Sequence, residues 1–224
     1  MRDISWIPNF LKNFSGPTEH KPGAIEDFKF CSHPDEIVHR HQPLALEPIY
    51  QHRLSELVFQ LKPKRYAVIG VLFGTTESFL LQCQNYHPDL IVACDVDLAD
   101  YNPKRDTGTI AYRNICGTQY GNFQGEFVYC RADSKKTDLF QKLGQYDFVF
   151  VDGEHTKEAA YSDLNKALSS LSDDGVILCH DLELPNCSTV DGYRRFCSDF
   201  DKWIQHVEIP ATDFQLGLGV IAKR

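Results

Sequence analysis

Short runs of apolar residues recur along this chain, and they predict the strands of a sheet. Residues 148–151 are continuously apolar and β-branched or aromatic, as expected of a parallel strand covered on both faces. Comparable runs occupy 66–71, 90–97, 126–134 and 176–179, and two further runs at 203–210 and 214–224 close the chain. The pattern therefore predicts seven strands.

Between these runs, apolar residues recur at steps of three and four and predict helices. Such spacing covers 48–61 and 157–171, with Thr156 as the expected N-cap of the second helix, and shorter helices are expected after residue 74 and over 136–143. Asp173, Asp174 and Gly175 are expected to separate a helix from a strand. The alternation predicts an α/β fold with a doubly wound, mostly parallel seven-stranded sheet, a C-terminal antiparallel hairpin and an N-terminal extension.

Two segments lack a sustained period. Residues 1 to about 30 carry scattered proline and glycine, so 1–45 is predicted to be an irregular arm or lid beside a domain spanning 46–224. Residues 98–124 are polar and predict either a short helix with long loops or an insertion that faces the substrate.

Composition limits the function classes. A chain of 224 residues is long enough for one domain, and its net charge of −8 argues against binding of long nucleic acid, which requires a basic face, although a local basic patch remains compatible with it. No uninterrupted apolar stretch approaches about 18 residues and no signal-like segment begins the chain, so we expect a soluble cytoplasmic protein. Whether it forms a homo-oligomer is left open.

The eight cysteines do not predict disulfides or a zinc site. Cys94, Cys130 and Cys179 fall in apolar strand runs, where a reduced cysteine behaves as a small hydrophobic residue. The pattern Cys31-x-His33 followed by His39-x-His41 does not match the usual spacings of structural zinc sites.

Charged residues follow the fourth and fifth predicted strands. Asp152, Glu154 and His155 come after one strand, and His180 and Asp181 come after the next. Because the carboxyl ends of parallel strands meet at one edge of the sheet, which is where such folds bind ligands, these five side chains should be neighbours. For His180 alone, a purely structural hydrogen-bonding role is equally compatible with the sequence.

The first three strand ends carry groups suited to a nucleotide-like ligand. Gly70 and Gly74, followed by Thr75 and Thr76, form a strand-to-helix turn that lets the backbone approach an anion or carboxylate. Asp95 ends the second strand, where an acid commonly accepts hydrogen bonds from ribose, or is simply solvated.

Asp133 and Ser134 end the third strand. They either lie beside an adenine ring or cap the next helix.

This arrangement resembles the class I S-adenosylmethionine-dependent methyltransferases, especially the small-molecule O-methyltransferases of the catechol, antibiotic and sugar type. The likeness covers about residues 45 to 224, and its most specific parts are VDGEHTKEAAYSDLNKAL, GVILCHD and the terminal GLGVI. It implies a Rossmann-like methyltransferase fold. It also implies roles for the cofactor-binding candidates: Gly70, Gly74 and Thr76 at the methionine end, Asp95 at the ribose, Asp133 and Ser134 at the adenine, and Asp152 beside them.

In metal-dependent relatives, acids at the ends of the fourth and fifth strands hold Mg²⁺, and these positions correspond to Asp152 and Asp181 here. Hard oxygen ligands suit that ion. The likeness makes Asp152 and His155 the catalytic candidates, with His155 as general base, since an unperturbed pKa near 6.5 suits proton transfer close to neutrality.

The sequence departs from the family pattern at two positions. Val68 stands where the first strand usually carries an acid that contacts the amino group of the cofactor. Leu182 stands where several metal-dependent members place another oxygen ligand, so either His180 or Glu154 completes the shell or no metal binds.

The sequence thus predicts transfer of a methyl group from S-adenosylmethionine to a hydroxyl of a small-molecule acceptor, with Mg²⁺ as an optional second cofactor. One alternative is a non-catalytic relative that binds a nucleotide-like ligand or a protein. The other is an NAD-dependent oxidoreductase, which the absence of GxGxxG spacing in the first turn disfavours.

Overall fold

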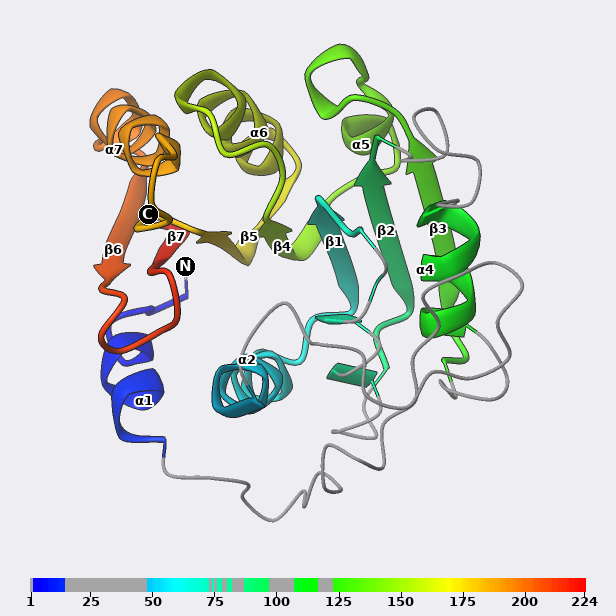
Figure 1. Ribbon diagram of the computed structural model, residues 1–224, viewed down its shortest axis with the longest axis horizontal. Coiled ribbons are helices and arrows are strands. Elements are labelled where there is room, and N and C mark those ends of the chain that lie inside the picture. Colours follow the sequence, from blue (N-terminus) through cyan, green and yellow to red (C-terminus); the bar gives the residue numbers. More distant parts are fainter. Residues whose placement is uncertain are drawn as a thin grey trace.

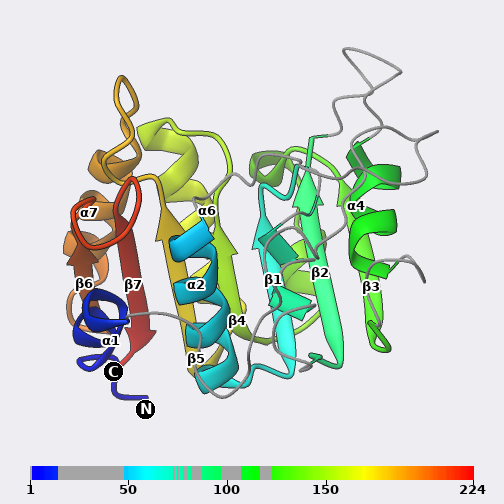
Figure 2. The same ribbon diagram turned by 60° about the horizontal axis from the view of Figure 1, so that its bottom comes forward.

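The computed structural model describes residues 2–14, 48–72, 74, 76–77, 80–81, 87–96, 107–116 and 123–224. Seven strands form one sheet in the order β3-β2-β1-β4-β5-β7-β6. The strands are β1 Arg65–Ile69, β2 Leu90–Asp95, β3 Glu126–Arg131, β4 Tyr146–Val151, β5 Leu171–His180, β6 Ile204–Ile209 and β7 Leu218–Lys223. Figure 2 shows them side by side, and β7 is antiparallel to both of its neighbours. The predicted fold class, including the C-terminal antiparallel strands, is confirmed.

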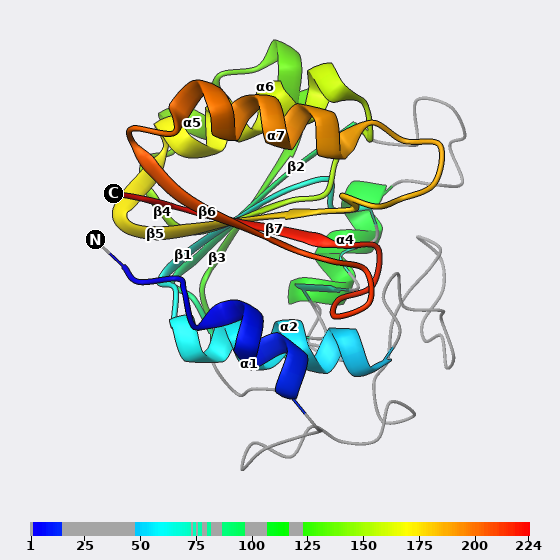
Figure 3. The ribbon, with the colours of Figure 1, turned by 90° about the vertical axis from the view of Figure 1, so that its left-hand side faces the viewer.

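Helices cover both faces of the sheet and make a three-layer molecule (Figures 1 and 3). One layer contains α1 Ile7–Asn13, α2 Pro48–Leu61 and α4 Thr107–Cys116, and the other contains α5 Leu139–Lys142, α6 Lys157–Ser169 and α7 Thr189–Phe200, with a short 3-10 turn η3 at Ser134–Lys136. Adjacent residues of β1 serve opposite layers: Tyr66 and Val68 pack with α1, α2 and α4, whereas Ala67 and Ile69 pack with α5, α6 and α7. Burial on both faces explains why the central strands are continuously apolar.

Several boundaries differ from the prediction for clear reasons. α6 begins at the predicted N-cap, where the Thr156 hydroxyl accepts a hydrogen bond from Ala159 N–H, but it ends at Ser169. Leu171 already pairs with Tyr146 as the first residue of β5, and a register irregularity carries the exposed Asp173 and Asp174 past the end of the helix. The expected helix break was wrong, because the break lies before Leu171.

The N-terminal segment is not irregular throughout. Ile7 and Leu11 of α1 are fully buried beside α2, and the Gln205 side chain donates a hydrogen bond to Arg2 O. These contacts fix residues 2–14 against the sheet layer, contrary to the irregular arm expected there. The division into an arm at 1–45 and a domain at 46–224 stays a prediction.

Other predictions concern segments that are described only in part. Residues 107–116 form a helix, which resolves part of the ambiguous interval 98–124. Cys31, His33, His39 and His41 lie outside the described residues. Cys94, Cys130 and Cys179 are buried free thiols, as predicted. No helix within the described ranges combines the length and apolar character that crossing a membrane requires.

Candidate functional site

A cavity of about 660 Å³ opens at the carboxyl ends of β1 to β5. Its size falls in the range typical of small-molecule and cofactor sites, about 300–1,000 Å³. Its lining contains every predicted cofactor-binding residue except Gly74, together with three further residues predicted for the charged cluster, Glu154, His155 and Asp181. The structure therefore joins the two groups of candidates in a single site.

The turn after β1 requires glycine where it touches β4. Gly70 has φ +83°, and a Cβ atom there would lie 2.0 Å from the backbone oxygen of Asp152. Gly74 has φ +64° and packs against Ile115 of α4. The absence of a side chain at Gly70 thus lets the start of the turn lie directly against the residue that follows β4.

Asp95 organises this turn. Its Oδ2 accepts hydrogen bonds from Val71 N–H at 2.8 Å and Leu72 N–H at 2.7 Å, and Leu72 adopts φ +45°. A carboxylate that accepts two backbone N–H groups holds the loop in one conformation. The predicted contact of Asp95 with ribose therefore concerns a side chain that already shapes the neighbouring turn.

Thr76 and the end of β3 complete this side of the cavity. The Thr76 hydroxyl accepts a hydrogen bond from the buried Gln51 amide of α2 at 3.4 Å. Asp133 caps η3 by accepting from Lys135 N–H at 2.9 Å, and the Ser134 side chain hydrogen-bonds to Asp163. The capping role weighed for Asp133 is thus present in the structure, while both residues still line the cavity.

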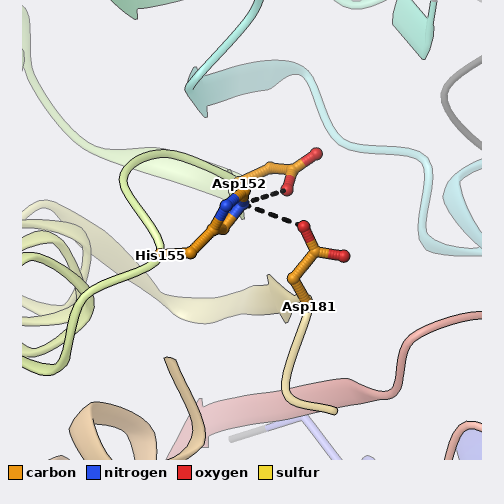
Figure 4. A group of neighbouring side chains, drawn as sticks. All are labelled: Asp152, His155 and Asp181. Carbon is orange, nitrogen blue, oxygen red and sulfur yellow. Dashed lines mark ion pairs between the residues drawn. The ribbon is translucent and has the colours of Figure 1, made fainter. Parts of the chain in front are cut away.

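The opposite side of the cavity holds a cluster of two aspartates and two histidines, three of which are drawn in Figure 4. Asp152 follows β4, and Asp181 follows β5 with φ +60°, a conformation uncommon outside glycine. His155 Nε2 lies 2.8 Å from Asp181 Oδ2 and 3.8 Å from Asp152 Oδ1. The imidazole thus lies between the two carboxylates.

His180 lies behind the same carboxylates and is only 5% exposed. Its Nδ1 is 3.4 Å from Asp152 Oδ1 and 3.0 Å from Asp181 Oδ1, and its Nε2–H donates to Gln215 O at 3.0 Å. Because both ring nitrogens have partners, His180 orients the aspartates from the protein interior.

Mutual pairing shifts every pKa in this cluster toward the charged form. The carboxylates of Asp152 and Asp181 raise the pKa of His155 to about 10. Burial lowers the pKa of His180, but the charge of Asp152 and contacts with both aspartates outweigh it and raise the value to about 10. Burial raises the pKa of each aspartate, yet the histidines hold both below their ordinary range.

The proton-transfer role predicted for His155 therefore requires that the pKa of its imidazole be lowered. With a pKa of about 10 its imidazole carries a proton at neutral pH, whereas a general base must be unprotonated. His155 can accept a proton only when other positive charge compensates the two carboxylates.

The donor set fits a divalent cation. One atom each from Asp152, His155 and Asp181 lie within 4.8 Å of one another, close enough to surround a single ion. Mg²⁺ is usually held by one or two carboxylates plus several waters, so the two aspartates suffice. His180 does not belong to this three-atom group, and Glu154 instead pairs with Lys135 across the rim of the cavity.

Sequence reasoning missed a buried acid in the lining of the cavity. Glu77 follows Thr76 and is 2% exposed, a burial that is rare for glutamate. Its only sequence signal is a charged residue between a glycine turn and the apolar residues 79–81, and that pattern alone does not separate a solvated helix start from a buried acid.

Residues 67–182 match a protein family described as a methyltransferase domain. The match spans more than half of the chain, so the chain belongs to this family. It includes the ends of β1 to β5 that form the cavity. No curated protein sequence matches the chain.

Solved structures with the same fold include three methyltransferases. The S-adenosylhomocysteine-bound methyltransferase PaMTH1 of Podospora anserina is 18% identical, with a TM-score of 0.57 and coverage of 80% of this chain and 79% of that chain. An O-methyltransferase of Bacillus cereus in complex with S-adenosylhomocysteine is 18% identical (TM-score 0.58; 80% and 82% covered). TomG of Streptomyces achromogenes, an O-methyltransferase of tomaymycin synthesis in complex with S-adenosylmethionine, is 17% identical (TM-score 0.58; 80% and 82% covered). At this identity they show the shared fold.

Proposed function

We propose that this methyltransferase transfers a methyl group from S-adenosylmethionine to a hydroxyl oxygen of a small molecule. The observation that carries the proposal is the single cavity lined by the Gly70 turn and Asp95 at one end and by Asp152, His155 and Asp181 at the other. The ligands named for the structurally similar proteins support it. The cytoplasmic location stays a prediction.

At the cofactor end, the Gly70 turn and Thr76 are proposed to bind the methionine part, Asp95 the ribose, and Asp133 with Ser134 the adenine. Gly74 belongs to the same turn but packs on α4 and does not line the cavity, so its proposed role is to support the turn. When bound, the cofactor supplies an electrophilic methyl group on a positively charged sulfur. The protein's part is to hold that end rigidly, because rate enhancement in a displacement depends mainly on distance and alignment.

At the acceptor end, Asp152 and Asp181 are proposed to orient the hydroxyl group and His155 to accept its proton. His180 fixes the two carboxylates from behind. A divalent cation held by Asp152 and Asp181 would supply positive charge that lowers the pKa of the acceptor hydroxyl. The cluster thus combines an orienting pair of acids with a proton acceptor.

The direct test is calorimetric titration of the purified protein with S-adenosylmethionine and, separately, with NAD(H). The first titration is repeated with Mg²⁺ and with chelator and followed by transfer of isotope-labelled methyl to a panel of phenols and sugars. Selective S-adenosylmethionine binding with label transfer supports the proposal. Selective NAD(H) binding would replace it with an oxidoreductase, and binding of neither ligand would favour a non-catalytic relative.

The assigned roles predict different defects in two variants. Asp95→Ala removes two hydrogen bonds to the turn, so S-adenosylmethionine affinity should fall on the order of 10- to 100-fold. His155→Ala should chiefly lower turnover, by about 100-fold or more for a proton-transfer group, with cofactor affinity nearly unchanged. Equal loss of cofactor affinity in both variants would contradict these roles.

Asp147→Ala is the matched control for Asp95→Ala. Asp147 Oδ2 also accepts two backbone N–H groups, from Lys64 and Arg65 at 3.0 and 3.1 Å, at the start of β1 rather than at the cavity. It should cost similar stability and leave cofactor affinity intact.

A further inference from the structure

Glu77 is a buried acid with an incomplete set of partners. Its Oε1 accepts a hydrogen bond from the Tyr66 hydroxyl at 3.3 Å. Its Oε2 is buried and has no hydrogen-bond partner among the described residues. A carboxylate oxygen in that state is costly for the fold, so its retention calls for a physical reason.

The surroundings of Glu77 leave one direction from which a polar partner can come. On one side the residue borders a small pocket lined mainly by apolar side chains such as Val58, Leu80 and Ile91. On the other side it borders the large cavity, together with Gly70 and Thr76. Since no described residue donates to Oε2, a ligand in that cavity is a source of a donor for this oxygen.

The charges near Glu77 favour a cationic donor. Burial, and to a smaller extent the negative charges of Asp152 and Asp95, raises the pKa of Glu77 to about 7, while hydrogen bonds from its own backbone N–H and from the Tyr66 hydroxyl oppose that rise. A positively charged group placed here would satisfy Oε2 and also relieve the repulsion among the three carboxylates.

Glu77 also packs against the face of β1 that carries Val68. Tyr66, which holds Glu77, and Val68 are two residues apart and pack into the same layer. Val68 is fully buried and apolar at the position where the resembled enzymes carry an acid. The chain therefore has valine in place of a carboxylate at position 68 of the strand, but the helical residue Glu77 presents a carboxylate to the same region.

We infer that Glu77 binds the α-ammonium group of the methionine part of the cofactor, in place of the acid missing at Val68. The inference rests on the proposed function, because it presumes that S-adenosylmethionine occupies the cavity. It assigns Glu77 a binding role and leaves the chemistry of methyl transfer to the cluster at β4 and β5.

The experiment compares S-adenosylhomocysteine with its deamino analogue, in which hydrogen replaces the α-amino group, by calorimetry on the whole protein. The wild type should prefer the amino form on the order of 10- to 100-fold, as expected for a buried charged hydrogen bond. Glu77→Gln keeps the shape and an acceptor for Tyr66, so it should reduce that preference to a few-fold and leave the affinity for the analogue unchanged.

Asp163→Asn is the matched control. Asp163 is another acid only 1% exposed, with a pKa raised to about 6 chiefly by burial and an unpartnered Oδ1, but it does not line the cavity. Asp163→Asn can change both affinities, because Asp163 hydrogen-bonds to Ser134 in the cavity lining. The ratio of the two affinities should nevertheless stay at the wild-type value.

The outcomes separate the inference from the proposed function. If neither ligand binds the wild type, the proposed function fails. If the wild type binds both ligands equally, or if Glu77→Gln keeps the wild-type preference, the inference is overturned and the proposed function stands. The wild-type ratio alone decides the first two cases, and the assignment to Glu77 is decided by the variant, whose binding of the deamino analogue shows that it is folded.

Discussion

The two ends of the cavity treat buried charge in opposite ways. At β4 and β5, Asp152 and Asp181 are each paired with histidines, and all four pKa values shift toward the charged forms. At the Gly70 turn, the described contacts of the Glu77 carboxyl are with its own backbone N–H and the Tyr66 hydroxyl, and its pKa shifts toward the neutral form. At the first end each charge has an oppositely charged neighbour within the protein, whereas at the second end one carboxylate oxygen has no partner among the described residues.

Substitution of Gly70 should have the largest effect, because the backbone of this residue lies directly against Asp152 and so connects the Gly70 turn with the acidic cluster. In Gly70→Ala, the new methyl group would lie 2.0 Å from Asp152 O at φ +83°, so the turn and β4 must separate. We expect a loss of about 3 kcal/mol or more in the free energy of unfolding, measured by urea denaturation, together with loss of cofactor binding.

Gly144→Ala is the control for that substitution. Gly144 also has positive φ, +109°, but the nearest atom to its added methyl group is the Arg65 guanidinium at 3.2 Å. The change should cost about 1–2 kcal/mol from backbone strain alone and leave binding intact. A similar loss in both variants would show that strain, not contact with Asp152, dominates at Gly70.

The pH dependence of stability should sharpen the contrast at Glu77. Between pH 4.5 and about 7 the unfolded chain loses the Glu77 proton while the folded protein keeps it, so Glu77 lowers stability as pH rises through this window. At about 1.4 kcal/mol per pH unit, Glu77→Gln should match the wild type near pH 4.5 and exceed it by up to about 3 kcal/mol above pH 7, without ligand. Thermal or urea unfolding of both proteins from pH 4.5 to 8 measures the difference, and a variant less stable at pH 8 would contradict this account.

Addition of Mg²⁺ tests the acidic cluster at β4 and β5, and its expected effect on the free energy of unfolding is smaller than that of Gly70→Ala. Mg²⁺ held by Asp152 and Asp181 should stabilise the protein by about 2–3 kcal/mol at a concentration one hundred times its dissociation constant. The shift in melting temperature should vanish with chelator and in Asp181→Asn, while affinity for S-adenosylhomocysteine stays near the wild-type value. Stabilisation that persists in Asp181→Asn would place the ion elsewhere.

The sheet was predictable because burial on both faces leaves a simple signature. β1, β2 and β4 each contain an uninterrupted apolar run, and their predicted extents differ from the observed strands by two residues or fewer at each end. α7 received no prediction, although Val190, Tyr193, Cys197 and Phe200 follow helical spacing. Its exposed face is strongly charged, and this charge obscured the apolar stripe.

The site was predictable in position and less so in chemistry. Chain direction alone placed Asp152, His155 and Asp181 at one edge, where the structure has them. The pKa of His155 depends on two carboxylates brought together by the fold, so the unperturbed value near 6.5 was the wrong guide. The unpartnered oxygen of Glu77 depends on burial by distant segments, which no local pattern encodes.

The contact between His180 and Gln215 has a consequence for synthesis of the chain. Gln215 precedes β7, which inserts between β5 and β6, so the carbonyl that holds His180 is made 35 residues after that histidine. While a ribosome is still translating this segment, β5 has a bare edge and His180 has no carbonyl to hold it. The emerging protein can therefore form the Gly70 turn early. The acidic cluster at β4 and β5 becomes ordered only after β7 has left the exit tunnel.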